Sequence, residues 1–197
     1  MKFGKSLRSQ IAESLPEWEG EFMSYKELKK RVNQIAPWHE ETKRCRKRPR
    51  LTTRNMLCTG GRNMNIMRGG IGFIQLLDSK LEKVNAFFFE KEEEYIIRMK
   101  ELKDRVANVE CSGDMMQVSK DILDFHREIV LLLHYSVLNF TGLMKIIKKH
   151  NKKTGSFIHL PSVPRVLQQP FFTTDLIREL LKECDAMLNQ LFLVNKP

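Results

Sequence analysis

The stretch that decides the fold is SKDILDFHREIVLLLHYSVLNFTGLMKIIKKHNKK, residues 119–153. Apolar side chains recur along it every three or four residues, which places them on one stripe of an α-helix. The stripe starts just upstream of the quoted residues and comprises Met115, Val118, Ile122, Phe125, Ile129, Leu132, Phe140, Leu143 and Ile147. We therefore expect one long helix with a single buried face.

The last nine residues of this stretch, KIIKKHNKK at 145–153, are rich in lysine. At about 100° per residue, four of the lysines share one helix face. They are Lys145, Lys148, Lys149 and Lys152. Like charges at this spacing destabilise an isolated helix, whereas Ile146 and Ile147 point the other way, toward a core. An anionic ligand would offset the repulsion.

A second long helix precedes the first and starts near Ile71. Its apolar residues follow a nearly seven-residue repeat that is interrupted at Glu92. They are Ile74, Leu77, Leu81, Val84, Phe88, Tyr95, Met99, Leu102 and Val106. Ser112, Gly113 and Asp114 make the turn between the helices. Two long antiparallel helices are the simplest arrangement.

The N-terminal residues predict a helical hairpin. Phe3, Leu7, Ile11 and Leu15 lie at four-residue steps in a short amphipathic helix. Pro16 ends this helix and suits the first turn of the next one. The second helix covers EWEGEFMSYKELKKRVNQI, residues 17–35, with an apolar stripe of Leu28, Val32 and Ile35.

The C-terminal part predicts two further helices. Gly155 ends the lysine-rich helix, and Pro161 and Pro164 open a short helix. Thr173 or Thr174 caps the last helix. Its apolar stripe is Leu176, Leu180, Cys184, Met187 and Leu191. Because no stretch alternates long enough to indicate a sheet, the predicted fold is all-α.

The segment from Pro37 to about Gly70 lacks periodicity and reads as a flexible basic insert, 37–70, within one domain, 1–192, followed by a tail, 193–197. Six basic residues lie between Lys43 and Arg50. Their KRCRKRPR resembles a nuclear localisation signal or a non-specific nucleic-acid patch. A solvated basic loop explains it equally well.

Composition narrows the class of partner. The chain has 197 residues, 42% of them hydrophobic and 29% charged, which is typical of a folded soluble domain. Its net charge of +10 favours anionic partners. Its four cysteines are scattered, as free thiols in a reducing compartment would be. The N-terminus lacks an apolar leader, and we expect no membrane-spanning run.

Catalysis has no support in the sequence. GxSxG, HExxH, P-loop and GxGxxG motifs are all absent. His126 and His134, two turns apart, are ordinary helical histidines, and no His–Cys set has zinc-ligand spacing. We therefore expect a protein that is not an enzyme, with no catalytic residues, no metal ligands and no cofactor.

An anion site has better support. Most charge runs are solvated helix faces. Here the lysines of 145–152 are segregated by phase, with few compensating glutamates, and a second basic group stands in SYKELKK, residues 24–30. Tyr25 and Lys29 lie there one turn apart, and they supply a hydroxyl donor and a point charge for phosphate oxygens.

Three motifs in order resemble the SPX domain. They are MKFGKSL…LPEW…SYKELKK at the N-terminus, FTGLMKIIKKHNKKTG at 140–155 and VLQQPFFTTDLI at 166–177. The chain is most similar to stand-alone SPX proteins of plants, over nearly its whole length except the insert. This resemblance implies an N-terminal helical hairpin packed on a three-helix bundle with two long antiparallel helices.

The resemblance also implies the ligand, inositol hexakisphosphate or an inositol pyrophosphate. Tyr25, Lys29 and Lys149 match the family's phosphate-binding cluster. Its surrounding lysine surface corresponds to Lys145, Lys148 and Lys152, and Lys2 matches an N-terminal lysine that reaches the same ligand. Lys5, Lys26 and Lys153 are neighbours outside the predicted set. Asn151 stands where many members have Asp, so a local counter-charge is missing.

Partners follow from the same resemblance. Other family members carry transporters, a polyphosphate polymerase or a RING ubiquitin ligase, whereas stand-alone plant members bind MYB-type phosphate starvation response transcription factors when loaded and keep them off their promoters. We expect a phosphate-status sensor of the nucleus and cytoplasm, with no direct contact to nucleic acid or membrane. The rival hypotheses are a nucleic-acid binder and a plain helical adaptor with a solvated lysine face.

Overall fold

The computed structural model of the chain describes residues 3–35, 60–108, 112–155 and 169–194. It gives side-chain detail for 3–35, 71–108, 113–155 and 169–191. The α-helices are α1 (Phe3–Ile11), α2 (Tyr25–Gln34), α4 (Gly60–Ala107), α5 (Ser112–Thr154) and α7 (Asp175–Val194). Two 3-10 helices are η1 (Pro16–Glu21) and η2 (Pro170–Phe172). No strand occurs in these ranges, and the all-α prediction is confirmed.

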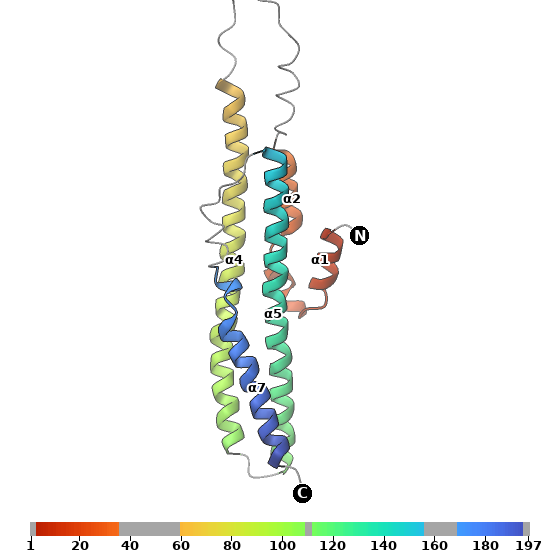
Figure 1. Cartoon of the computed structure of the whole chain (residues 1–197), viewed down its shortest axis with the longest axis vertical. Coiled ribbons are helices and arrows are strands. Elements are labelled where there is room, and N and C mark those ends of the chain that lie inside the picture. The colour runs from red at the N-terminus through yellow and green to blue at the C-terminus, as the bar shows by residue number, and fades with distance from the viewer. Residues whose placement is uncertain (1–2, 36–59, 109–111, 156–168, 195–197) are drawn as a thin grey trace, which may run out of the picture.

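The two long helices, α4 and α5, run antiparallel side by side and set the long axis of the molecule (Figure 1). The third helix of the bundle, α7, packs on both of them along the half nearest the α4–α5 turn. The N-terminal helices α1 and α2 pack on the other half of α5. The hairpin on a three-helix bundle is therefore as predicted, and α5 carries a different partner at each end.

The core forms where the predicted stripes meet. Most stripe residues of α4 and α5 are buried, and Leu28, Val32 and Ile35 of α2 join them. Trp18 of η1 and Tyr135 of α5 are also fully buried, with ring centroids 6.4 Å apart. Burial of these large side chains stabilises the packing of the hairpin on the bundle.

The helix predicted over residues 17–35 is wrong as a single element, because it splits into η1 and α2. Ser24 has non-helical dihedral angles, φ −69° and ψ 70°. The backbone N–H of Met23 donates to Asn139 Oδ1 at 2.8 Å. This buried bond to α5 replaces a bond within the helix, so tertiary contact overrides the local helical pattern.

The start of α4 also differs from the prediction. This helix begins at Gly60, so the backbone of 60–70 is helical where we expected an irregular insert and a start near Ile71. The glycine-rich sequence there lacks the apolar periodicity from which a helix is recognised. The KRCRKRPR segment lies outside the described residues, and so does the helix predicted at Pro161 and Pro164.

The predicted helix ends agree with the structure at two places. Gly155 has φ 63°, in the left-handed region that favours glycine, and its N–H donates to Asn151 O at 3.0 Å as α5 ends. At the start of α7, the N–H of Arg178 donates to Thr174 O at 3.0 Å, as expected for Thr174 as the N-cap. Ser112 and Asp114, predicted as a turn, belong to the first turn of α5.

The stripe of α7 is one residue out of phase at its start. Leu176 is exposed, and Ile177 is buried in its place. Cys184 is a free, buried thiol, and burial raises its pKa to about 12. The other cysteines lie outside the described residues. The boundary at 192 stays a prediction, since α7 continues to Val194.

The expectation of no membrane-spanning run needs correction. One described helix, Gly113–Thr154, is long and apolar enough to cross a membrane by length and composition. Half of its most apolar window is buried inside the bundle, and the core helix of a soluble protein passes the same test. The apolar character of α5 is therefore explained by its central position.

Candidate anion-binding site

The C-terminal turns of α5 separate their side chains as the sequence predicted. Ile146 and Ile147 are buried, whereas Lys145, Lys148 and Lys152 are exposed and Lys149 is half-buried. The burial of the isoleucines fixes the rotation of the helix, so the lysines must project to one side. The lysine face is a consequence of core packing.

The N-terminus of α2 delivers Tyr25 and Lys29 to the same end of the bundle. Tyr25 is the first residue of α2, and Lys29 lies one turn further on. Both are half-buried. Burial raises the pKa of Tyr25, so its hydroxyl remains a hydrogen-bond donor over the physiological range.

A buried network sets the position of α2 on α5. Asn139 Oδ1 accepts the Met23 N–H, and Asn139 Nδ2 donates to Tyr135 O at 2.9 Å. The Tyr135 hydroxyl donates to Glu21 O at 3.0 Å. These bonds fix the chain just before Tyr25, so α5 itself determines where the α2 side chains lie.

Helix α1 supports the tyrosine from its other side. The rings of Phe3 and Tyr25 meet edge to face with centroids 5.0 Å apart. A Cβ at Gly4 would stand 3.6 Å from the Tyr25 ring, an ordinary van der Waals distance, so α1 lies close to the tyrosine without requiring glycine there. The ammonium of Lys145 lies 5.7 Å from the Phe3 ring centroid, a cation–π contact that connects α1 to the lysine face.

Lys149 is where the two basic groups converge. Its pKa is lowered first by burial, then by the charges of Lys29 and Lys153. Lys29 comes from α2 and the other two from α5, so cations from different helices face one another. An anion placed between them would remove the repulsion and favour the charged form of Lys149.

Lys153 is the residue that the sequence reasoning missed. Its Nζ donates to the carbonyl oxygen of Asn33, in the last turn of α2. A lysine at this place satisfies a free carbonyl and complements the negative end of the helix dipole. The signal available in the sequence was its spacing of four residues from Lys149.

For the remaining predicted site residues, Lys148, Lys152 and Lys2, the described part of the chain shows no contact with the α2 part of the site. Lys148 and Lys152 lie on the outer side of α5, and no contact between them and α2 is recorded among the described residues. Lys2 lies outside the described residues. Its assignment, like the assignment of the whole set to a ligand, stays a prediction.

An open cleft of about 580 Å³ adjoins Tyr25 and Lys29. Residues of α1, η1 and α2 form its walls, which include the basic side chains of Lys5, Arg8 and Lys26 and the carboxylate of Glu19. Two of these were the neighbours left outside the predicted set. Within the described residues no group of His, Cys, Asp and Glu has the arrangement of a metal site. The lysine ammonium groups and the tyrosine phenol can together bind an anion at several points.

Comparisons with known proteins show what this chain is similar to. The sequence profile of the SPX domain matches residues 1–59. SPX domain-containing protein 2 of Arabidopsis thaliana is 52% identical over 197 residues, covering 100% of this chain and 68% of that protein. SPX domain-containing protein 1 of the same plant is 51% identical, covering 100% and 73%.

A solved structure is similar to the whole fold. It is the SPX domain of glycerophosphodiester phosphodiesterase 1 from Chaetomium thermophilum, in complex with inositol hexakisphosphate. The TM-score is 0.73 at 26% identity, covering 98% of this chain and 99% of that one. The similarity includes both the hairpin and the bundle, so it extends over every element that forms the basic cluster.

Proposed function

The chain belongs to the SPX domain family, and on this basis we propose that it is a non-catalytic sensor that binds inositol polyphosphates. The observation that carries the proposal is the convergence of Lys29 from α2 with Lys149 and Lys153 from α5, near enough for their charges to lower the pKa of Lys149 in addition to its burial. The complex of the related fungal domain with inositol hexakisphosphate supports this class of ligand.

Each predicted residue has a role in this proposal. Tyr25, Lys29 and Lys149 hold the phosphates at the junction of α2 and α5. Lys145, Lys148 and Lys152 surround them, and Lys2 is assigned to the same ligand by the family resemblance. Several charge-assisted bonds to one polyanion stabilise the folded state in proportion to ligand binding, and they weaken with added salt.

The partner is the finer part of the proposal. The loaded surface binds a MYB-type phosphate starvation response transcription factor and keeps it from its promoters, in the nucleus and cytoplasm. An inositol pyrophosphate is the signal of phosphate status. Names of the Arabidopsis and rice relatives, all SPX domain-containing proteins, support the family comparison from which this role is carried over.

Calorimetric titration with inositol hexakisphosphate tests the ligand site. We expect Lys149→Ala and Lys29→Ala each to weaken binding by about tenfold, which corresponds to about 1.4 kcal/mol. Lys100→Ala, an exposed lysine of α4, is the matched control and should bind like the wild type. Inositol hexakissulfate should bind more weakly if phosphate is recognised specifically. If all three variants bound inositol hexakisphosphate as tightly as the wild type, the assignment of Lys29 and Lys149 to the ligand site would be wrong.

A pull-down tests the partner. The transcription factor should be retained in the presence of an inositol pyrophosphate and lost without it. Retention under both conditions contradicts the sensor and favours a plain adaptor. Binding of double-stranded DNA that competes with inositol hexakisphosphate would instead favour the nucleic-acid hypothesis.

A further inference from the structure

A second apolar row runs along α5, outside the core. Its members are Met116 (78% exposed), Leu123 (51%), Val130 (43%), Val137 (58%) and Met144 (42%). Each lies seven residues from the next, and the buried stripe of α5 occupies a different face. The bundle does not bury these side chains, and a row this regular has the character of a contact surface.

The spacing specifies the shape of that contact. Seven residues fall about 20° short of two full turns of a straight α-helix, so the row winds left-handed around α5. A second helix follows this path in a coiled coil. The four steps from Met116 to Met144 span about 42 Å. The row therefore fits one long helix.

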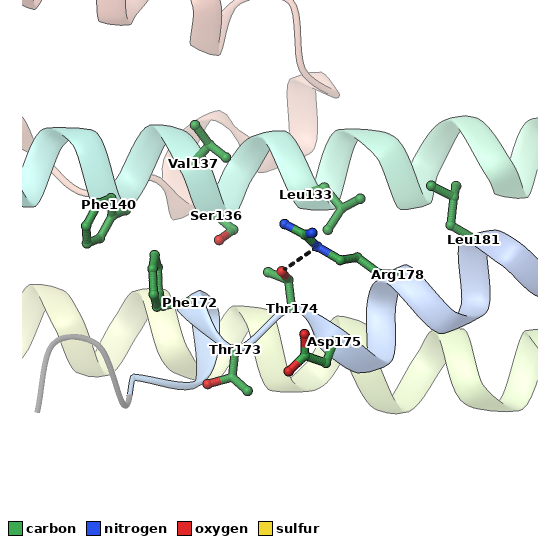
Figure 2. A pocket seen from close by; sticks show the side chains of 10 residues that line it. All are labelled: Leu133, Ser136, Val137, Phe140, Phe172, Thr173, Thr174, Asp175, Arg178 and Leu181. Carbon is green, nitrogen blue, oxygen red and sulfur yellow. Dashed lines mark hydrogen bonds between the residues drawn. The ribbon is translucent and has the colours of Figure 1, made fainter. Parts of the chain in front are cut away.

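The row borders a groove at its middle. An open cavity of about 710 Å³ lies between α5 and the start of α7, and Figure 2 shows Val137, Leu133 and Phe140 on its α5 side. The rings of Phe140 and Phe172 meet there with centroids 4.6 Å apart. Such a groove receives apolar side chains of an incoming helix, whereas a planar membrane does not enter it.

Cations flank the row. Lys120 and Arg127 are exposed, each four residues after a member of the row, and no ion pair of theirs is recorded among the described residues. Across the groove, Arg178 reaches between the helices and donates from Nε to Thr174 Oγ1 at 3.3 Å, and Asp175 lines the same groove (Figure 2). An incoming helix with acidic flanks complements both sides.

The positive charge beside the row also helps to decide what binds there: a second copy of the chain, a membrane or a helix of another protein. A second copy would bring the same lysine and arginines to the contact and a further net charge of +10, which opposes association. A helix that lies in a membrane surface needs a broad apolar face. Over most of its length, this row has only one exposed apolar residue in every seven. The remaining candidate is a helix of another protein with apolar heptads and Glu or Asp beside them.

We propose that the exposed row of α5 and the adjoining groove bind an amphipathic partner helix with acidic flanks, at a surface separate from the cleft at Tyr25 and Lys29. The interaction does not depend on the proposed inositol polyphosphate site. It gives the protein a second, helix-specific contact surface.

A labelled synthetic peptide of four heptads tests the proposal, with Leu at the seam positions and Glu on both flanks. Fluorescence anisotropy at physiological salt should show saturable binding to the full chain. A scrambled peptide of the same composition should bind at least tenfold more weakly, because it keeps the charge but loses the heptad. The double variant Leu123→Asp/Val137→Asp should weaken binding at least tenfold, whereas Ile97→Asp, an exposed apolar position on α4, should not.

Three outcomes would overturn the proposal. Equal binding of the designed and scrambled peptides would mean charge attraction alone. Sedimentation of the wild type as a dimer that the double variant abolishes would assign the row to a second copy. Binding to phosphatidylserine vesicles that the double variant abolishes, without peptide binding, would assign it to a membrane. Circular dichroism of the double variant checks that its helices remain.

Discussion

The two ends of α5 use charge in opposite ways. Near its start, Arg105 of α4 lies 2.7 Å from Asp121, and Arg98 donates two bonds to Glu128 at 2.9 and 3.0 Å. Near its end, Lys149 faces Lys29 and Lys153. One end pairs cations with carboxylates, and the other gathers cations.

The pKa shifts of Asp121 and Lys149 show what this contrast means for stability. The pKa of Asp121 is lowered chiefly by its hydrogen bond with Arg105, so folding favours the charged carboxylate. The pKa of Lys149 is also lowered, but for a base this means that folding disfavours the charged form. The first end stabilises the bundle in the absence of ligand. The second carries an electrostatic cost that an anion removes.

The largest effect is expected from the core at the paired end. Phe125 is fully buried and meets Tyr95 edge to face, with ring centroids 5.2 Å apart. We expect Phe125→Ala to lower the free energy of unfolding by about 3–5 kcal/mol, because it leaves a cavity. Urea denaturation measures this change. The affinity of the folded fraction for inositol hexakisphosphate should stay unchanged, and a parallel loss of affinity would contradict the separation of the two ends.

Compared with Phe125→Ala, a change at Asn139 should lower stability less and lower ligand affinity more. Replacement by Leu leaves the buried Met23 N–H without its acceptor, which costs about 1–3 kcal/mol. The same change releases the segment before Tyr25, so ligand affinity should fall as well. Urea denaturation and calorimetry measure the two effects. Lost stability with unaltered affinity would show that this anchor does not position Tyr25.

The smallest effect is a pH dependence from His150. Burial lowers the pKa of this ring, which stacks on Phe73 with centroids 4.6 Å apart. As pH falls through the ordinary value of 6.5, the unfolded chain takes up the proton before the folded one. Stability should therefore decline between about pH 7 and pH 5, above the range in which carboxylates titrate. Chemical denaturation at both pH values measures the decline, and His150→Phe should abolish it. An equal decline in that variant would assign the dependence to another group.

The regular parts of this fold were predictable from sequence because the helices are long and amphipathic. Phase alone placed the buried stripes of α4 and α5 and turned the lysines away from Ile146 and Ile147. The break at Met23 was not predictable, since its cause is Asn139, distant in the chain. The shift from Leu176 to Ile177 arises where η2 leads into α7, at a helix start with little periodicity to read.

The candidate site divides in the same way. The spacing of Tyr25 with Lys29, and of the lysines on α5, was readable one helix at a time. Their convergence on Lys149 depends on how α2 packs against α5, which no local pattern contains. Lys153 was passed over for the same reason, because its acceptor, the carbonyl of Asn33, belongs to another helix.

The central claim is tested most directly by thermal unfolding of two variants, each with and without inositol hexakisphosphate. Lys149→Met should keep or raise the melting temperature of the free protein and lose most of the ligand-induced increase. Arg98→Met should lower the melting temperature of the free protein and keep the full increase. A ligand-induced increase of the same size in both variants would contradict the account.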